Sequence, residues 1–351
     1  MSADDLVAEA RMMCCASCGL SELDDAKLKE CPACESVRYC SDECQREHRA
    51  KHEAMCKKRA AAAELRDEIL FRQPESTHKG DCPICFLPLP IDADKSMLHA
   101  CCSKMICFGC VYASTLRETQ ERLEPTCPFC RHPVPDTKEE SDRSLMKRIA
   151  ANDPVAIQQL GGKHYNEGDY ESAFEYWTKA VELGNVNAHY DLSLLYLNGD
   201  GVEKDEKKEA YHLEEAAIAG HPKARFNLAW YEVGNKRYER AVKHWIIAAK
   251  LGCEDSTQLL IEFYKHGDVS KEEYAAALRA HQATVNAMKS PQREAAAKAM
   301  AAGTIRFSFG VIDATYPREK IAQQRRLIKL LFVNNEKPTE GGSCKIHGSR
   351  R

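Results

Sequence analysis

The 351-residue sequence lacks any long hydrophobic run. Crossing a membrane takes about 20 predominantly apolar residues in a helix, so we expect no membrane partner. The first thirteen residues, MSADDLVAEARMM, are acidic and contain no apolar core, so we expect no secretory signal. Both absences favour a reducing compartment, cytoplasmic, nuclear or both. In such a compartment, close cysteine pairs favour metal binding over disulfide bonds.

The chain also lacks an excess of charge of either sign. The formal net charge is -3 and the pI is about 6.5. A protein whose main partner is nucleic acid usually carries a basic face or a basic recognition helix. The sequence has neither, so we expect no nucleic acid as the main partner.

Cysteine is almost absent after residue 130, where only Cys253 and Cys344 occur. The other sixteen of the eighteen cysteines lie between residues 14 and 130. Ten of them form pairs separated by two residues: Cys15/Cys18, Cys31/Cys34, Cys82/Cys85, Cys107/Cys110 and Cys127/Cys130. That gap lets both thiolates of a pair reach one tetrahedral ion. The pattern predicts a series of structural zinc sites, with a disulfide framework as the alternative.

The first candidate zinc unit covers residues 15–56 and contains eight ligands, enough for two tetrahedral sites. So short a segment buries too little apolar surface to fold alone. Metal binding then supplies the folding free energy, about 10–16 kcal/mol per structural site. The stretch from Cys40 to Cys56 has good helix formers and no Pro or Gly, which predicts a helix with Ser41 as its N-cap.

This order of ligands resembles the MYND zinc finger, whose central motif is similar to residues 39–45, YCSDECQ. The resemblance implies two interleaved sites and the binding of short peptides. Cys14 competes with Cys15 as a ligand, and we expect His48 to be a surface histidine. The implied sites are Cys15, Cys18, Cys40 and Cys44 for one zinc ion, and Cys31, Cys34, His52 and Cys56 for the other.

The second candidate zinc unit covers residues 81–135 and resembles the RING finger. Lys104 stands where a RING usually has a histidine or cysteine ligand, and an ammonium group cannot bind zinc. An all-cysteine variant of the family implies a different set, with His99 as the fallback for one of the adjacent cysteines. The implied sites are Cys82, Cys85, Cys107 and Cys110 for one ion, and Cys101, Cys102, Cys127 and Cys130 for the other.

The RING resemblance implies a ubiquitin ligase that recruits a ubiquitin-charged conjugating enzyme without covalent catalysis of its own. Ile84 and Pro128 match the family's contact positions on the two zinc loops. Arg131 matches the residue that hydrogen-bonds both the conjugating enzyme and ubiquitin, a bridging role that suits the planar guanidinium. The simpler interpretation is core packing for Ile84 and a solvated charge for Arg131. The alternative function is a scaffold whose modules only bind proteins.

Residues 150–282 contain an internal repeat. Gly184, Gly220 and Gly252 each end a similar run, TKAVELG, LEEAAIAG or WIIAAKLG. The pattern predicts pairs of helices that stack on one another, with each glycine as a left-handed cap. It also predicts that the Tyr and Trp side chains are mainly core and that the turn within a pair lies at Gly199/Gly201 or Gly234. It resembles the Sel-one-like branch of the tetratricopeptide superfamily. We count repeats at 153–184, 188–220 and 224–252, with a degenerate fourth at 256–281 as a cap.

The expected fold is therefore multidomain. Two small zinc-stabilised fingers, MYND and RING, are followed by an all-α solenoid of Sel-one-like repeats. Residues 57–80 are expected to form a helix from Ala60 to Phe71 and then a linker. Residues 283–351 are uncertain, apart from an expected helix from Ser290 to Ala302, a weak strand at 305–312 and disorder from Pro338 onward. The expected cofactor is four zinc ions. The expected partners are a conjugating enzyme, substrate or adaptor proteins, and short peptides.

Overall fold

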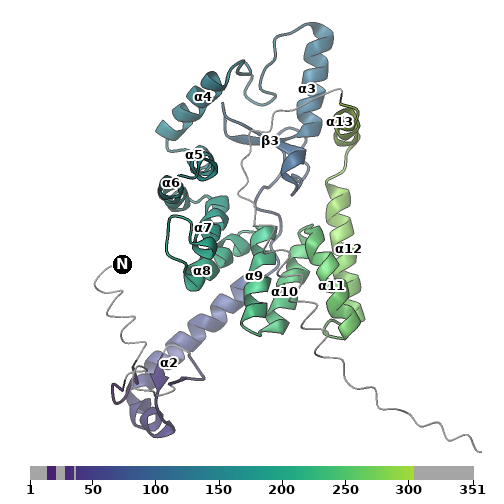
Figure 1. The fold of residues 1–351 in the computed structure, drawn as a ribbon. Helices are drawn as coiled ribbons and strands as arrows, with labels where there is room; N and C mark the ends of the chain where they lie inside the picture. The colour runs from purple at the N-terminus through teal and green to yellow at the C-terminus, as the bar shows by residue number, and fades with distance from the viewer. Residues whose placement is uncertain (1–13, 21–27, 35–36, 304–351) are drawn as a thin grey trace, which may run out of the picture. The chain divides into compact units, whose positions relative to one another are not determined.

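The computed structural model describes residues 14–20, 28–34 and 37–303 (Figure 1). The chain divides into two compact units, Met1–Arg72 and Gln73–Arg351. A weak strand predicted at 305–312, disorder predicted from Pro338, and Cys344 all lie outside the described residues. Among the described helices, none is both long enough and apolar enough to cross a membrane.

The first unit is built around residues 15–56, which we call the first finger. Strand β1 (Lys29–Glu30) pairs antiparallel with β2 (Arg38–Tyr39), and Lys29 lies opposite Tyr39. Helix α2 (Asp42–Leu70) follows, and the Ser41 hydroxyl caps it by accepting from the Cys44 N–H at 3.2 Å. The buried residues of the first finger are Cys15, Cys31 and Tyr39, with His52 beside them on α2. Two of the three core residues are therefore candidate ligands.

Helix α2 is longer than the sequence predicts. We expected one helix to Cys56 and a second from Ala60 to Phe71, but a single 29-residue helix covers both. The residues between the two predicted helices are Lys57, Lys58 and Arg59, and four alanines follow them. All are strong helix formers, and neither Gly nor Pro interrupts them, so nothing local ends the helix at residue 57.

The second unit contains residues 81–135, which we call the second finger. The 3-10 helix η2 (Ala93–Lys95) leads into β3 (Ser96–His99), which forms a hairpin with β4 (Lys104–Cys107). Helix α3 (Phe108–Glu121) follows directly. The buried core contains Leu89, Ile106 and Val111 together with Cys82, Cys107 and Cys127. Half of this small core is again cysteine.

The rest of the second unit is a series of helices joined by short turns. Most of these helices are thirteen residues long. Consecutive helices from α4 to α12 pack against each other, and α10 also contacts α12. Their bounds are α4 (Lys138–Ala150), α5 (Pro154–Glu167), α6 (Tyr170–Glu182), α7 (Val186–Asn198), α8 (Glu206–Ile218), α9 (Pro222–Gly234), α10 (Tyr238–Lys250), α11 (Glu254–His266), α12 (Lys271–Ala287) and α13 (Pro291–Ala301). The predicted helix from Ser290 to Ala302 is confirmed, with Ser290 as its cap.

Aromatic side chains fill the interior of the helix pairs, as predicted. Trp177 and Trp245 are fully buried, and Trp230 is 8% exposed. Trp177 lies directly over Gly161 of α5, where an added Cβ would come within 2.6 Å of the indole ring. The indole N–H donates to the Gln158 carbonyl at 3.0 Å. Gly161 therefore gives the indole the space it needs to pack against α5.

The turns of the repeats are mostly as expected. Gly184, Gly220 and Gly252 all have φ near +80° to +100°, which confirms the three predicted left-handed positions. The turn predicted at Gly234 lies slightly later. Gly234 is the last residue of α9, and the positive φ belongs to Lys236.

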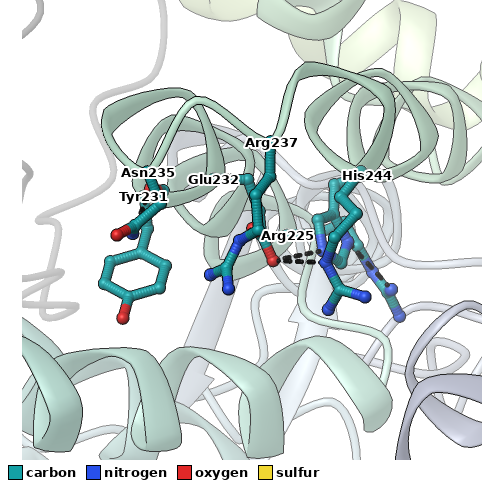
Figure 2. A network of polar contacts seen from close by, with 7 residues as sticks. Arg225, Tyr231, Glu232, Asn235, Arg237 and His244 are labelled. Atoms are coloured by element: carbon teal, nitrogen blue, oxygen red, sulfur yellow. Dashed lines mark hydrogen bonds and ion pairs between the residues drawn. The ribbon is translucent and has the colours of Figure 1, made fainter. Parts of the chain in front are cut away.

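A buried polar network joins α9 to α10 in the third pair of helices (Figure 2). The Glu232 carboxylate is almost fully buried and pairs with both Arg237 and Arg240. Arg225 has no exposed surface, and its guanidinium donates to the Ala217 carbonyl at 2.7 Å. Burial lowers the pKa of Arg225 to about 10. His244 lies beside Arg225, at 3.4 Å between Nη1 and Nδ1. Because the Glu232 carboxylate is ion-paired and the Arg225 guanidinium is hydrogen-bonded to the backbone, we assign the network a structural role.

The second finger packs against the helices, and residues 73–80, predicted to be a linker, are part of that contact. The His78 N–H donates to the Gly220 carbonyl at 3.1 Å, and the His78 ring stacks on His221 with centroids 4.1 Å apart. A Cβ added to Gly252 would lie 3.1 Å from Cδ1 of Ile91. At the far end of the unit, α13 packs against α3, side by side with it in Figure 1. The sequence of residues 73–80 is hydrophilic and contains a proline, so it predicts a linker. No local pattern in it indicates the surface on which it docks.

Candidate functional site

Three of the cysteine pairs form turns with the same backbone geometry, which we call knuckles. In each, the first cysteine accepts from the N–H four residues later, at 2.9 Å for Gly19, Phe86 and Arg131. These three residues have φ values of 75°, 56° and 61°. The N–H of the first cysteine also donates to the backbone carbonyl five residues later, at 2.8 to 3.0 Å. The turn brings both thiols of a pair to the same side, which is the reason the two-residue gap suits a metal.

The structure brings the sixteen candidate ligands together in four groups. In each group the ligand atoms lie within 4.8 Å of one another. The grouping interleaves in both fingers: the first and third pairs share one site, and the second and fourth pairs share the other. Cys14, His48 and His99 lie outside the groups. The members are Cys15, Cys18, Cys40 and Cys44; Cys31, Cys34, His52 and Cys56; Cys82, Cys85, Cys107 and Cys110; and Cys101, Cys102, Cys127 and Cys130.

The spacing of the ligand atoms fits tetrahedral zinc. Zinc–sulfur bonds of about 2.3 Å place tetrahedral sulfur atoms about 3.8 Å apart. The Sγ atoms lie 3.6 Å apart for Cys18 and Cys40, and 3.7 Å for Cys31 and Cys56. In the second finger the separations run from 3.4 Å for Cys101 and Cys130 to 3.9 Å for Cys102 and Cys127. A disulfide needs about 2.05 Å, so the disulfide alternative does not describe these pairs.

Protonation of the thiols also points to a cation. The hydrogen bond from Cys107 lowers the pKa of Cys82 to about 4, and the same interaction raises the pKa of Cys107. Burial, followed by the contact with Cys130, raises the pKa of Cys101. Without a metal, each group holds some thiols ionised at the expense of others, because four thiolates this close repel one another. A divalent ion removes the repulsion between the thiolates. Three of the groups offer four sulfur ligands each, and the fourth offers three sulfurs and one nitrogen, and both sets suit Zn²⁺.

Side chains that the sequence did not point to support the ligands of the first finger. Tyr39 is buried, and its hydroxyl lies 3.1 Å from Nδ1 of His48. The His48 ring stacks on the ligand His52 at 5.7 Å between centroids. Burial, followed by His52, lowers the pKa of His48, which keeps that ring neutral. His48 is therefore a supporting residue rather than the free surface histidine we expected. The signal was its spacing of four residues from His52, which places both on one helix face.

In the second finger, a buried carboxylate positions the last zinc loop. Glu118 of α3 is 5% exposed and accepts from the N–H of Thr126 at 3.2 Å and from its hydroxyl at 2.8 Å. Thr126 directly precedes the ligand Cys127. The side chain therefore joins α3 to the knuckle of Cys127 and Cys130. Its sequence signal is weak, because a glutamate near the end of a helix is usually solvated.

The three residues singled out for a conjugating enzyme lie on the knuckles of the second finger. Ile84 is 36% exposed and stands between Cys82 and Cys85. Pro128 is half-buried and stands between Cys127 and Cys130, and Arg131 is exposed directly after them. Two further apolar side chains of these knuckles, Phe86 at 76% and Phe129 at 44%, are also exposed. None of the five is a core residue, which disfavours plain core packing for Ile84.

A cavity of about 160 Å³ lies between the second finger and the first helices of the three repeats. The finger contributes the hairpin residues Ser96, Leu98 and Met105, and the helices contribute residues from the starts and inner faces of α5, α7 and α9. The second finger therefore covers part of the surface that the repeats would otherwise offer to a partner.

The family comparisons agree with this architecture. The MYND finger family model matches residues 15–56, and the Sel1 repeat model matches 154–185, 186–221 and 222–253. The chain carries a MYND finger and three Sel1 repeats. The resemblance to both families is thereby confirmed. MYND fingers and Sel1 repeats are protein-interaction modules.

Individual relatives are similar over short stretches. "Putative beta-lactamase HcpC" of Helicobacter pylori strain J99 is 40% identical over 60 residues, which are 17% of this chain and 21% of that protein. Its counterpart in strain 26695 is 39% identical over 56 residues, 16% and 19% of the two chains. The chain thus spans about a fifth of the length of these curated relatives.

Two solved structures resemble the chain at low identity. A Sel1 repeat protein from Oxalobacter formigenes is 22% identical with a TM-score of 0.36, covering 55% of this chain and 78% of that one. The protective antigen c5321 of uropathogenic Escherichia coli is 19% identical with a TM-score of 0.36, covering 57% and 46%.

Proposed function

We propose that the second finger is a RING-type ubiquitin ligase module, and that the MYND finger and the Sel1 repeats select its substrates. One observation carries this proposal. Ile84, Pro128 and Arg131 all stand on two zinc knuckles of the same geometry, at the positions where the RING family contacts a conjugating enzyme, and none of the three is buried.

The proposed chemistry is positioning. The finger would hold a conjugating enzyme whose cysteine carries ubiquitin as a thioester. A substrate lysine amine attacks the thioester carbonyl, the isopeptide bond forms, and the carbon–sulfur bond breaks to release the enzyme's thiol. The finger supplies no nucleophile or base. Apolar side chains such as Ile84 would anchor the conjugating enzyme, and Arg131 would restrain ubiquitin through its planar set of donors. Zinc supplies the fixed shape of both knuckles.

The test is autoubiquitination of the full chain with a broad panel of conjugating enzymes. We expect Ile84→Ala and Arg131→Ala to lower the rate about 10- to 30-fold, the effect of removing a hot-spot contact. Arg131→Gly should lose as much activity, although glycine suits the φ of 61° at this position. Loss in that variant therefore reports the guanidinium and not a strained turn.

Arg122→Ala is the matched control, because Arg122 is an exposed arginine with φ of 56° in the same finger but off the knuckles. It should retain wild-type activity. The alternative is a scaffold whose modules only bind proteins, and Lys104, exposed on β4 in place of a ligand, favours it. A wild-type chain that holds its zinc yet is inactive with the whole panel would leave the scaffold as the function.

A further inference from the structure

The guanidinium of Arg293 reaches a zinc loop some two hundred residues earlier in the sequence. Nη1 donates to the Pro88 carbonyl at 2.7 Å, and Nη2 donates to the Leu87 carbonyl at 3.2 Å. Nη2 also points at the Sγ atom of the ligand Cys85, at 3.5 Å. A further bond from Nη1 to the carbonyl of Met288, the C-cap of α12, holds the side chain against the end of that helix at 2.7 Å.

The backbone around Arg293 is fitted to this position. Helix α13 packs against α3, and an added Cβ on Gly109 would lie 2.7 Å from the backbone nitrogen of Arg293. Only a glycine at residue 109 lets the two helices come this close. Ser290 caps α13 by accepting from the Arg293 N–H at 3.2 Å, and Ala296, one turn later, is 1% exposed.

The charge of the neighbouring site explains what a half-buried guanidinium does there. Four thiolates and one Zn²⁺ carry a formal charge of −2, and both Cys82 and Cys107 are almost fully buried. Removing such a charge from water is costly unless a counter-charge or hydrogen bonds compensate it. Arg293 supplies a positive charge and an N–H···S contact at one of the ligands.

We propose that Arg293 is an outer-sphere partner of the zinc site formed by Cys82, Cys85, Cys107 and Cys110, so that the last described helix of the chain stabilises metal binding by the second finger. The inference is independent of ligase activity. Groups that hydrogen-bond metal ligands typically change metal affinity 10- to 100-fold when they are removed.

The test measures zinc release from the full chain. Excess chelator is added to zinc-loaded protein, and an indicator dye records how many ions leave and how fast. Arg293→Gln should release one of the four ions about 10- to 100-fold faster than wild type, with the other three unchanged. Arg293→Lys should be intermediate, because an ammonium keeps the charge but not the fork of donors.

Lys298→Gln is the control, because it removes an exposed positive charge from the same helix and should leave all four rates unchanged. Gly109→Ala keeps Arg293 but pushes α13 away from α3, so it should accelerate the same single ion. That variant decides the question if Arg293→Gln fails to fold. Wild-type release of all four ions from either folded variant would overturn the proposal.

Discussion

The two fingers and the Sel1 repeats are stabilised in opposite ways. The cores of the fingers are largely made of metal ligands: Cys15 and Cys31 in the first, and Cys82, Cys107 and Cys127 in the second. The core of the repeats is apolar and aromatic, with residues such as Trp245, Leu260 and Phe263 and no metal group among the described residues of α4 to α13. The fold of the fingers should therefore depend on zinc, and that of the repeats on packing.

The largest contrast is expected from two cysteine substitutions. Cys82→Ser removes a buried ligand, so we expect the second finger to unfold and release both of its zinc ions, with a loss of folding free energy on the order of 10 kcal/mol. Cys253→Ser changes a buried thiol in the repeats, 8% exposed, that is not a ligand. It should retain all four ions. Metal content by mass spectrometry distinguishes the two, and equal zinc content would remove the contrast.

A substitution at Trp245 tests whether the fold of the repeats depends on packing of their apolar core. Trp245→Ala leaves a large cavity in the repeats, so we expect a loss of about 3–5 kcal/mol of their unfolding free energy in urea. Tyr238→Ala, at a site 38% exposed in the same helix, should cost less than half as much. Emission of the remaining tryptophans reports the transition, because all three lie in the repeats. In the absence of urea, the Trp245→Ala variant should keep the zinc ions of the first finger bound.

We expect acid to lower the unfolding free energy of the repeats, because these helices contain buried histidines. Burial, followed by the charges of Arg225, Arg240 and Arg237, lowers the pKa of His244 to about 2. Burial lowers the pKa of His212 to about 4. The unfolded chain binds a proton at each below its ordinary pKa of about 6.5, whereas the folded chain does not. Their contribution is therefore complete above pH 6.5 and is lost as the pH falls towards 4 and 2.

The expected loss is up to about 1.4 kcal/mol per pH unit for each histidine. Urea unfolding of the repeats at pH 7.5, 6.5 and 5.5, followed by tryptophan emission, measures it. His244→Gln should lower the slope between pH 6.5 and 5.5 by one histidine's share. An unchanged slope would mean that His244 titrates alike in both states.

The smallest effect is expected at the cap of α2. Ser41→Ala removes the acceptor for the Cys44 N–H and should cost about 1 kcal/mol, whereas Ser41→Gly should cost a few tenths. Because His52 and Cys56 lie on this helix, the loss should appear as weaker zinc binding by the first finger alone. Competition with a chelator of known affinity measures it, and equal effects of Ala and Gly would contradict a capping role.

Local spacing decided what the sequence could predict. The two-residue gaps of the cysteine pairs indicate paired metal ligands, the resemblance to the two finger families implied how the pairs share sites, and Gly220 could be recognised as a left-handed cap. The docking contacts could not. Arg293 meets Cys85 across two hundred residues, and His78 meets Gly220 across more than a hundred, with no local pattern to mark either contact. The continuity of α2 was missed for a different reason, since helix formers fill the predicted gap.

The most direct measurement is chelation of the full chain, followed by both metal content and amide hydrogen exchange. Four zinc ions per chain should leave, and protection should be lost in residues 15–56 and 81–135. Tryptophan emission and protection in the Sel1 repeats should remain native. Fingers that keep their protection after all metal has been removed, or a chain that binds far fewer than four ions, would contradict zinc as the organiser of the fingers.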